Sequence, residues 1–191
     1  MDTVAKDLTP SQLVVLGLIA RHGPMTPYEL KARVESSVSR YWPIPHAQLY
    51  RDPPRLADLG LLREDAEEHG RRRRVFHLTA AGHETLRSWL ADPTTPEPET
   101  RNPALLKLTF ADLGAPGQVG ELAGAQAAQH RQWLDTYLDM RAQLDPHAPD
   151  TPARTRLLTL GIAHEQSYVT FWESLAADPD GTGAPGPEAA G

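Results

Sequence analysis

The chain has 191 residues, of which 19 are lysine or arginine, 25 are aspartate or glutamate and 8 are histidine, and it contains no cysteine. A chain of this length folds as one or two small domains. The lack of cysteine excludes disulfides, thiolate-bound zinc, iron–sulfur clusters and a thiol nucleophile, and it favours a cytoplasmic location. The longest apolar run, Leu13 to Ala20, is too short to span a bilayer, so we expect no membrane partner.

Two capping boxes open the first pair of predicted helices. In Thr9-Pro10-Ser11-Gln12 and in Thr26-Pro27-Tyr28-Glu29, a threonine precedes proline at the first helical position and a Gln or Glu follows three residues later. Apolar residues at helical spacing then predict one helix over 10–22 and a shorter one after Thr26. The tight turn at Gly23-Pro24 joins them, as in a helix-turn-helix.

A third helix, a ribbon of two strands and a closing helix are predicted next. Gly60 stands where the third helix should end in a left-handed conformation, and Thr79 caps the closing helix. This order is typical of a winged helix-turn-helix domain, which we assign to residues 1–91. The predicted elements are a helix over 46–59, strands over 61–65 and 75–79, and a helix over 80–91.

Side chains suited to DNA are predicted on three of these elements. The third helix carries polar residues in its first turns, where a recognition helix reaches base edges and phosphates. Arginine and lysine on the second helix and the ribbon suit phosphate. Gln48 and Arg51 can read bases, whereas Lys31 and Arg33 would hold the backbone. The candidate DNA-binding residues are Lys31, Arg33, His46, Gln48, Tyr50, Arg51, Arg55, Arg71, Arg72, Arg73 and Arg74.

These candidates also have structural interpretations. Tyr50 can pack on the first helix, and His46 can cap the third. The arginine run 71–74 can be a solvated turn whose charge is balanced by the preceding carboxylates, because charge runs are usually solvated. Those carboxylates are Glu64, Asp65, Glu67 and Glu68.

Short motifs follow one another in a fixed order through residues 10–91. They are Leu16-Gly17-Leu18-Ile19, Gly23-Pro24-Met25-Thr26-Pro27-Tyr28-Glu29-Leu30-Lys31, Trp42-Pro43, Gln48-Leu49-Tyr50, Arg55-Leu56, Leu59-Gly60-Leu61 and Leu78-Thr79-Ala80-Ala81-Gly82. As an ordered set they resemble the PadR family of transcriptional regulators. The resemblance implies a dimeric winged-helix repressor that binds DNA and is often relieved by a phenolic acid or a hydrophobic toxic compound.

Residues 51–55 depart from that family's pattern. Arg51-Asp52-Pro53-Pro54-Arg55 places two prolines within the third helix, where each removes a backbone donor and costs about 3 kcal/mol. Asp52 is a good N-cap for a helix that starts again at Pro53. The sequence therefore predicts a kink near Arg51 that re-aims the end of the helix facing DNA.

A proline-rich linker, residues 92–102, separates a second and acidic half. Residues 1–91 carry 13 basic and 11 acidic side chains, whereas residues 92–191 carry 6 and 14, so the halves have net charges of +2 and −8. We assign residues 103–177 to a helical dimerisation and effector domain. Residues 178–191 have too little apolar surface to fold and are expected to be a disordered tail.

The last predicted helix is apolar over more than half of its circumference. One partner helix within the chain cannot cover it, so we expect a second copy to do so. Such pairing would set two recognition helices on an inverted-repeat operator in double-stranded DNA. The candidate dimerisation residues are Leu157, Leu158, Ile162, Tyr168, Phe171 and Leu175. The predicted fold is mainly α with a two-stranded β-wing: an N-terminal winged helix-turn-helix plus a C-terminal antiparallel helical dimerisation module.

Aromatic residues concentrate in the same half of the chain. Aromatics at helical spacing are more often core or interface than ligand site. If an effector binds, a flat apolar or phenolic compound between these helices is the hypothesis that the sequence favours. The candidate effector-binding residues are Trp133, Tyr137, His164, Tyr168 and Trp172.

The sequence does not favour an enzyme. It has no His-Glu-x-x-His pair, phosphate-cradling glycine loop or serine elbow. His130 and His164 with acidic residues could hold a metal, but structural histidines are commoner, so we expect no metal and no cofactor. The remaining alternative is a winged-helix module that contacts an acidic protein and does not bind DNA.

Overall fold

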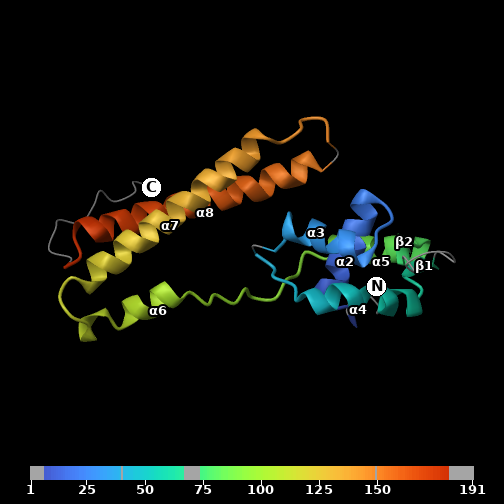
Figure 1. Ribbon diagram of the computed structural model, residues 1–191, viewed down its shortest axis with the longest axis horizontal. Coiled ribbons are helices and arrows are strands. Elements are labelled where there is room, and N and C mark those ends of the chain that lie inside the picture. The colour runs from blue at the N-terminus through green and yellow to red at the C-terminus, as the bar shows by residue number, and fades with distance from the viewer. Residues whose placement is uncertain (1–6, 40, 67–73, 149, 181–191) are drawn as a thin grey trace. The chain divides into compact units, whose positions relative to one another are not determined.

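The computed structural model describes residues 7–39, 41–66, 74–148 and 150–180. Its elements are labelled in Figure 1, and the chain divides into two compact units, Met1–Glu97 and Pro98–Gly191. The division falls within residues 92–102. Most of the predicted tail lies outside the described residues. Within the described ranges, no helix is both long and apolar enough to cross a membrane.

The first unit begins with three helices, α2 (Pro10–His22), α3 (Pro27–Glu35) and α4 (His46–Asp58). Both predicted capping boxes are confirmed: Thr9 exchanges hydrogen bonds with Gln12, and Thr26 does so with Glu29. Each box satisfies backbone N–H groups that a helix start leaves free. Between α2 and α3 the chain turns at Gly23, whose φ of 86° favours glycine.

Two antiparallel strands and a helix complete the first unit. The strands β1 (Leu62–Ala66) and β2 (Arg74–Leu78) pair with Glu64 opposite Phe76, and α5 (Ala80–Ala91) follows. Phe76 also exchanges two backbone hydrogen bonds with Met25, of 2.9 and 3.1 Å. Met25 lies in the turn between α2 and α3, so the ribbon is tied to the helix-turn-helix through the main chain.

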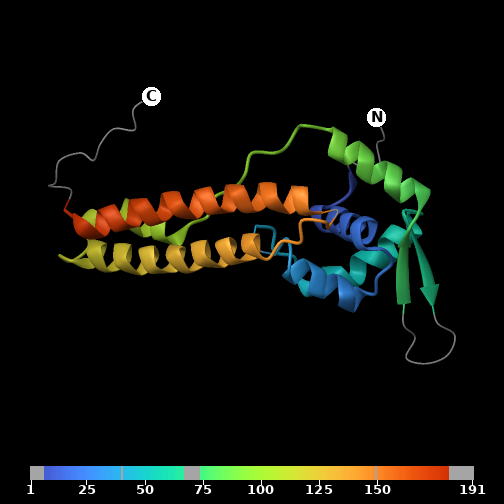
Figure 2. The same ribbon diagram turned by 90° about the horizontal axis from the view of Figure 1, so that it is seen from above.

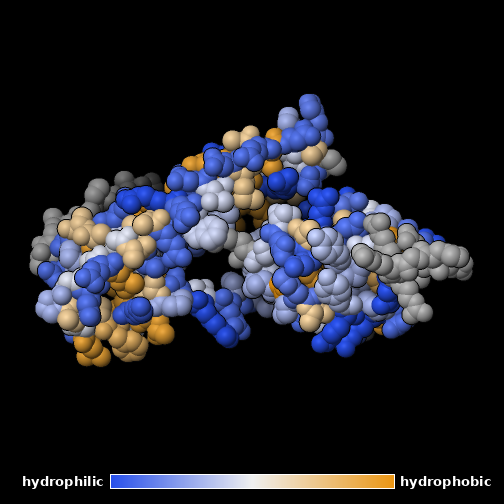
Figure 3. Space-filling view, in the orientation of Figure 1, coloured by the Kyte–Doolittle hydropathy of each residue, from blue (hydrophilic) through white to orange (hydrophobic). Residues whose placement is uncertain are grey.

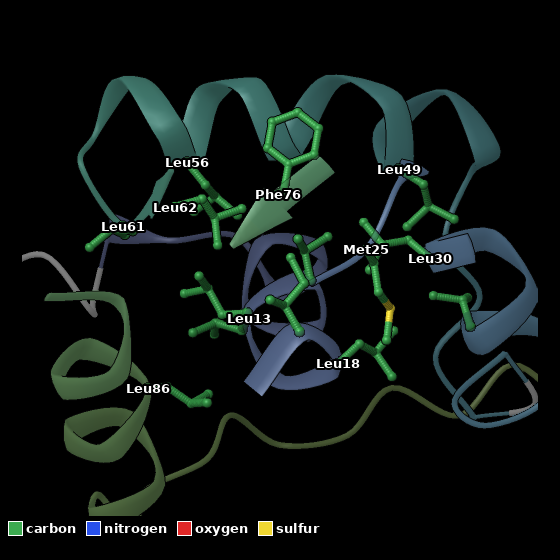
Figure 4. Packing of buried hydrophobic residues seen from close by; sticks show 14 of the residues in the cluster. Leu13, Leu18, Met25, Leu30, Leu49, Leu56, Leu61, Leu62, Phe76 and Leu86 are labelled. Carbon is green, nitrogen blue, oxygen red and sulfur yellow. The ribbon is translucent and has the colours of Figure 1, made fainter. Parts of the chain in front are cut away.

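The core of this unit lies between α4, α2 and the ribbon. Figure 4 shows Leu49 and Leu56 pointing from α4 toward the cluster that contains Phe76 and Leu13. Leu49, Leu56 and Phe76 have no exposed surface. Their burial fixes which face of α4 points inward, and therefore which face remains available for a ligand.

The predicted restart of the third helix at Pro53 is wrong. One helix runs from His46 to Asp58 with Pro53 and Pro54 inside it, and Asp52 is not an N-cap. Instead, the Ser11 hydroxyl on α2 donates a 2.6 Å hydrogen bond to the buried Asp52 carboxylate. Pro53 packs in the core together with Leu49 and Leu56. These contacts between helices hold the prolines in a continuous helix, which local propensity alone does not favour.

The second unit contains α6 (Pro103–Thr109), a short 3-10 turn η1 (Ala111–Leu113), α7 (Gln118–Ala142) and α8 (Thr151–Ala177). Figures 1 and 2 show α7 and α8 side by side along their length, joined at one end, so they form an antiparallel pair. Trp172 of α8 is wholly buried against Ala123 and Ala127 of α7 and Ala104 of α6. The small alanines leave room for the indole ring between the helices.

Candidate nucleic-acid interface

The outer surface of α4 carries two stripes of polar side chains. Gln48, Arg51 and Arg55 project within about 60° of one another, because a helix turns 100° per residue. The two arginines are exposed and Gln48 is partly so. His46 and Tyr50, one turn apart, form the other stripe, and both are exposed. A helix with this pattern can present arginine forks and an amide to base edges while its opposite face stays in the core.

Only one of the two basic residues predicted on α3 adjoins the start of α4. Lys31 lies 3.7 Å from Glu35, and Glu35 lies 3.5 Å from the His46 imidazole. Arg33 is exposed on another side of α3, since residues two apart on a helix do not share a face. Lys31, Glu35 and His46 therefore form one charged cluster, and Arg33 stands apart from it.

On the ribbon, Arg74 is paired within the protein. Its Nε and Nη2 donate to the two carboxylate oxygens of Glu64, the second bond being 2.6 Å long. The Arg74 hydrogen bond is the main reason that the pKa of Glu64 is lowered. Arg71, Arg72 and Arg73 lie outside the described residues. Arg74 is the one arginine of this run that the structure describes. Its pairing with Glu64 fits the interpretation in which the preceding carboxylates balance the charge of the run.

Exposed aromatic side chains near the helix-turn-helix were not among the predicted contacts, apart from Tyr50. Tyr28 on α3 and Tyr41 and Trp42 in the segment between α3 and α4 are all exposed. Burial of part of its ring raises the pKa of Tyr41, and the positive charge of Arg21 offsets part of that rise. Hydrophobic periodicity misses these residues because they lie in a turn or on a polar face.

The predicted dimerisation residues fall on two faces of α8. Leu158 and Ile162 are buried within the chain, so only part of the predicted set is open to a second copy. Leu157 and Phe171 are exposed, and so is Leu160, which the prediction omitted. A second apolar patch covers α6 and η1, where orange atoms gather in Figure 3. Its members are Leu105, Leu106, Phe110 and Leu113.

Of the predicted effector-binding residues, His164 and Tyr168 are in contact. The Tyr168 ring lies 4.5 Å from His164 and 4.6 Å from His130, centre to centre. His130 Nδ1 is 2.6 Å from a carboxylate oxygen of the buried Glu165. The His130–Tyr168 ring contact and the His130–Glu165 hydrogen bond join α7 to α8.

The other predicted effector residues lie elsewhere on the helix pair. Tyr137 of α7 packs on Gly161, where an added Cβ would come within 3.0 Å of the ring. Trp133 is half-buried on α7. Trp172 has no exposed surface and lies in the core cluster with Ala104, Ala123 and Ala127. No group of three or more metal-ligating side chains occurs among the residues with described positions.

A helix-turn-helix with an exposed recognition helix, followed by a two-stranded wing and a closing helix, defines a DNA-binding protein of the winged helix-turn-helix class. The model of the transcriptional regulator PadR-like family matches residues 15–88, and the model of the virulence activator alpha C-terminal domain matches residues 100–178. Residues 15–88 are thus a domain of the PadR-like family of transcriptional regulators, and residues 100–178 resemble the C-terminal domain of the virulence activators. The predicted family and fold class are thus confirmed, and the chain is a regulator rather than an enzyme.

Known proteins resemble the chain over most of its length. The probable transcriptional regulator Rv1176c of Mycobacterium tuberculosis is 29% identical, over 78% of this chain and 87% of that protein. The crystal structure of Bacillus subtilis PadR in complex with operator DNA has a TM-score of 0.77 at 24% identity, over 88% of this chain and 98% of that one. The structure of the same protein with p-coumaric acid has a TM-score of 0.72 at 24% identity, over 87% and 96%. The two structures support the fold.

Proposed function

We propose that this regulator is a homodimeric repressor that binds an inverted-repeat operator through α4 and is released by a small aromatic effector. The stripe of Gln48, Arg51 and Arg55 on the outer face of α4 carries the proposal. Arg51 and Arg55 make no ion pair with any described residue, so their charges remain available for DNA. Because its ligand is DNA, we place the protein in the cytoplasm.

The three residues of the stripe are assigned different tasks. The Gln48 amide can bond both a donor and an acceptor on the edge of adenine, and an arginine fork matches guanine or phosphate. Lys31 and Arg33 of α3 would hold the DNA backbone and add affinity without sequence preference. The arginines at 71–73 are proposed as further phosphate contacts, on sequence grounds alone.

The DNA-binding part of the proposal is tested by selecting duplexes from a random pool and measuring affinity by fluorescence anisotropy. Gln48→Ala should relax the preference at one base pair, at a cost of about 1–3 kcal/mol on the preferred sequence. Arg33→Ala should weaken binding to all duplexes equally. The control Arg87→Ala removes an exposed arginine from α5, where it pairs with Glu84, and should leave both properties unchanged.

Salt dependence separates this function from the alternative of a protein-contact module. A protein that neutralises several phosphates loses affinity steeply as salt rises, with a slope of about −0.9 per phosphate on logarithmic axes. Weak binding without sequence preference to every duplex, including the promoter of its own gene, would contradict the proposal and favour an acidic protein partner for the same face.

Dimerisation is proposed through the apolar side chains that the second unit leaves exposed, chiefly Leu157, Leu160 and Phe171 of α8 and the patch on α6 and η1. Two-fold pairing would place one α4 on each half-site of a palindromic operator. The DNA complex of Bacillus subtilis PadR contains operator DNA, which supports the choice of ligand.

For the effector, the mutually tilted rings of His130, Tyr168 and His164 are the described aromatic cluster best suited to a flat ligand. The p-coumaric acid complex of Bacillus subtilis PadR supports a phenolic compound as the class to test first. Such a ligand should shift tryptophan fluorescence and reduce operator affinity, because it favours a dimer in which the recognition helices are wrongly spaced. Fluorescence unchanged across a panel of phenolic and apolar aromatics would count against the effector.

A further inference from the structure

The Arg74 side chain at the start of β2 contacts more of its own protein than its place in an arginine run suggests. Its guanidinium forms two hydrogen bonds with the Glu64 carboxylate across the ribbon. The guanidinium carbon also lies 5.4 Å from the centre of the Phe76 ring, a cation–π distance. An arginine tied to a carboxylate fork and an aromatic face is held in one orientation.

Strand geometry places these contacts on the inner face of the ribbon. Side chains two residues apart on a strand share a face, so Arg74 and Phe76 lie on the same side. Glu64 is directly opposite Phe76 in the register and shares that face. Phe76 is wholly buried, so the Arg74 stem follows the core side of the ribbon. Arg63, Asp65 and His77 occupy the other side, where Asp65 pairs with both basic residues.

The pKa of Arg74 reflects the same pairing across the ribbon. The hydrogen bond with Glu64 is the largest cause of the raised pKa of Arg74, and the negative charge of Asp58 adds to it. Asp58 is the last residue of α4. Arg74 therefore contacts β1 through Glu64 and β2 through Phe76.

We propose that Arg74 is a positioning residue that holds the two strands of the wing together and does not bind phosphate. This inference rests on the proposed DNA-binding function. The Glu64 carboxylate already pairs with the Arg74 guanidinium, and a phosphate would have to displace it from a bidentate contact. Arg51 and Arg55 make no ion pair with described residues and need no such exchange. Arg74 thus differs in task from the exposed arginines of the same domain.

The proposal is tested with Arg74→Met, Glu64→Gln and the double variant, using a duplex selected by the wild-type protein. Affinity is measured over a series of salt concentrations. Arg55→Met serves as the reference for a DNA contact. Arg87→Met serves as the control for loss of an exposed paired arginine, because it pairs with Glu84 within α5.

We expect Arg74→Met and Glu64→Gln each to weaken binding about three- to tenfold, because either change releases the wing. The double variant should bind as Arg74→Met does, since both changes remove one interaction. The slope of log affinity against log salt should stay at the wild-type value in all three. In Arg55→Met the slope should fall in magnitude by about 0.9.

Opposite results would overturn the proposal. If Arg74 bound phosphate, Arg74→Met would reduce the salt slope as Arg55→Met does, and Glu64→Gln would tighten binding by freeing the guanidinium. If Arg74 only stabilised the fold, the folded variants would bind with wild-type affinity.

A double-mutant cycle on the free energy of unfolding separates failure of this inference from failure of the proposed function. It measures the Glu64–Arg74 coupling without DNA, and additive losses would refute the pairing. Absence of DNA binding by the wild-type protein, with the coupling intact, would instead refute the proposed function and this role with it.

Discussion

At Asp52 the chain buries a carboxylate in the middle of its recognition helix. The Ser11 hydroxyl is its hydrogen-bond donor among the described residues, at 2.6 Å, and both side chains are buried. A buried charged group with one good partner depends strongly on that partner. Local sequence rules identified Asp52 as a helix N-cap, and they could not reveal a contact with a residue 41 positions away.

Removing the Ser11 hydroxyl should therefore lower the free energy of unfolding by more than removing a typical exposed hydroxyl does. We expect Ser11→Ala to lower the free energy of unfolding by about 1–3 kcal/mol, because the Asp52 carboxylate stays buried without this bond. Urea unfolding followed by circular dichroism measures the change. Ser36→Ala, which removes an exposed hydroxyl bonded to the Arg33 carbonyl, should cost less than about 0.5 kcal/mol. Equal losses in the two variants would contradict the interpretation.

The ion pair at Glu64 predicts a pH dependence of a definite sign. Arg74 lowers the pKa of Glu64 from its ordinary value of 4.5, so folding favours the ionised carboxylate. Its contribution to stability is complete above pH 4.5 and is lost as the pH falls through the folded pKa. Glu64→Gln removes this contribution.

The unfolding free energies of wild type and Glu64→Gln should thus differ most near about pH 7 and converge in acid. Urea titrations across this range test the expectation. Glu84→Gln, on the exposed surface of α5, is the matched control. A difference between wild type and Glu64→Gln that grew toward low pH would show that the sign is wrong.

At the scale of elements, the sequence predicts best where local signals suffice. The capping boxes and apolar spacing predicted α2, and Thr79 marked the start of α5. Each strand of the wing differs from its predicted range by one residue at either end. The continuity of α4 was missed because packing of Pro53 in the core and the bond to Asp52 compensate for the prolines, and neither contact is encoded by neighbouring residues.

Pro54 should still destabilise the protein, because its packing does not compensate for the backbone hydrogen bond that it lacks. Pro54 is only half-buried and lacks the N–H that would bond one turn back. We expect Pro54→Ala to stabilise the protein by about 1–2 kcal/mol, after allowing for the greater freedom of the unfolded chain. Thermal unfolding followed by circular dichroism measures this change in stability. Pro53→Ala should gain less, because it leaves a cavity in the core. A lower melting temperature for Pro54→Ala would contradict this account.

For the candidate site, the sequence alone predicted the exposed polar residues of α4. It did not predict which charged residues of the domain form ion pairs with one another. The 3.6-residue period places Gln48, Arg51 and Arg55 on one face without any coordinates. The ion pair of Arg74 with Glu64 depends on the register between β1 and β2. The burial of Trp172, Leu158 and Ile162 depends on how α7 rotates about its axis against α8. These are properties of packing between elements rather than of a local pattern.

At the scale of the whole molecule, the exposed apolar side chains of the second unit favour dimerisation with a second copy of the chain. Size-exclusion chromatography with light scattering should give twice the 21.0 kDa of one chain. Leu160→Glu with Phe171→Glu should shift the protein toward a monomer, since charges would be placed in a buried interface. Leu90→Glu, which changes an equally exposed leucine of α5, should leave the mass unchanged. A wild-type monomer at micromolar concentration would refute the dimer.

The main-chain bonds between Met25 and Phe76 have a consequence for any regulation of DNA affinity. Each residue donates one bond to the other, which joins the wing to the turn of the helix-turn-helix, so we expect the wing and these helices to move together. Bending the wing away from this turn would break these bonds and uncover Phe76. In the proposed dimer, an effector would therefore change the distance between two unchanged winged helix-turn-helix domains, and DNA with a longer or shorter spacer between half-sites should restore binding to the liganded protein.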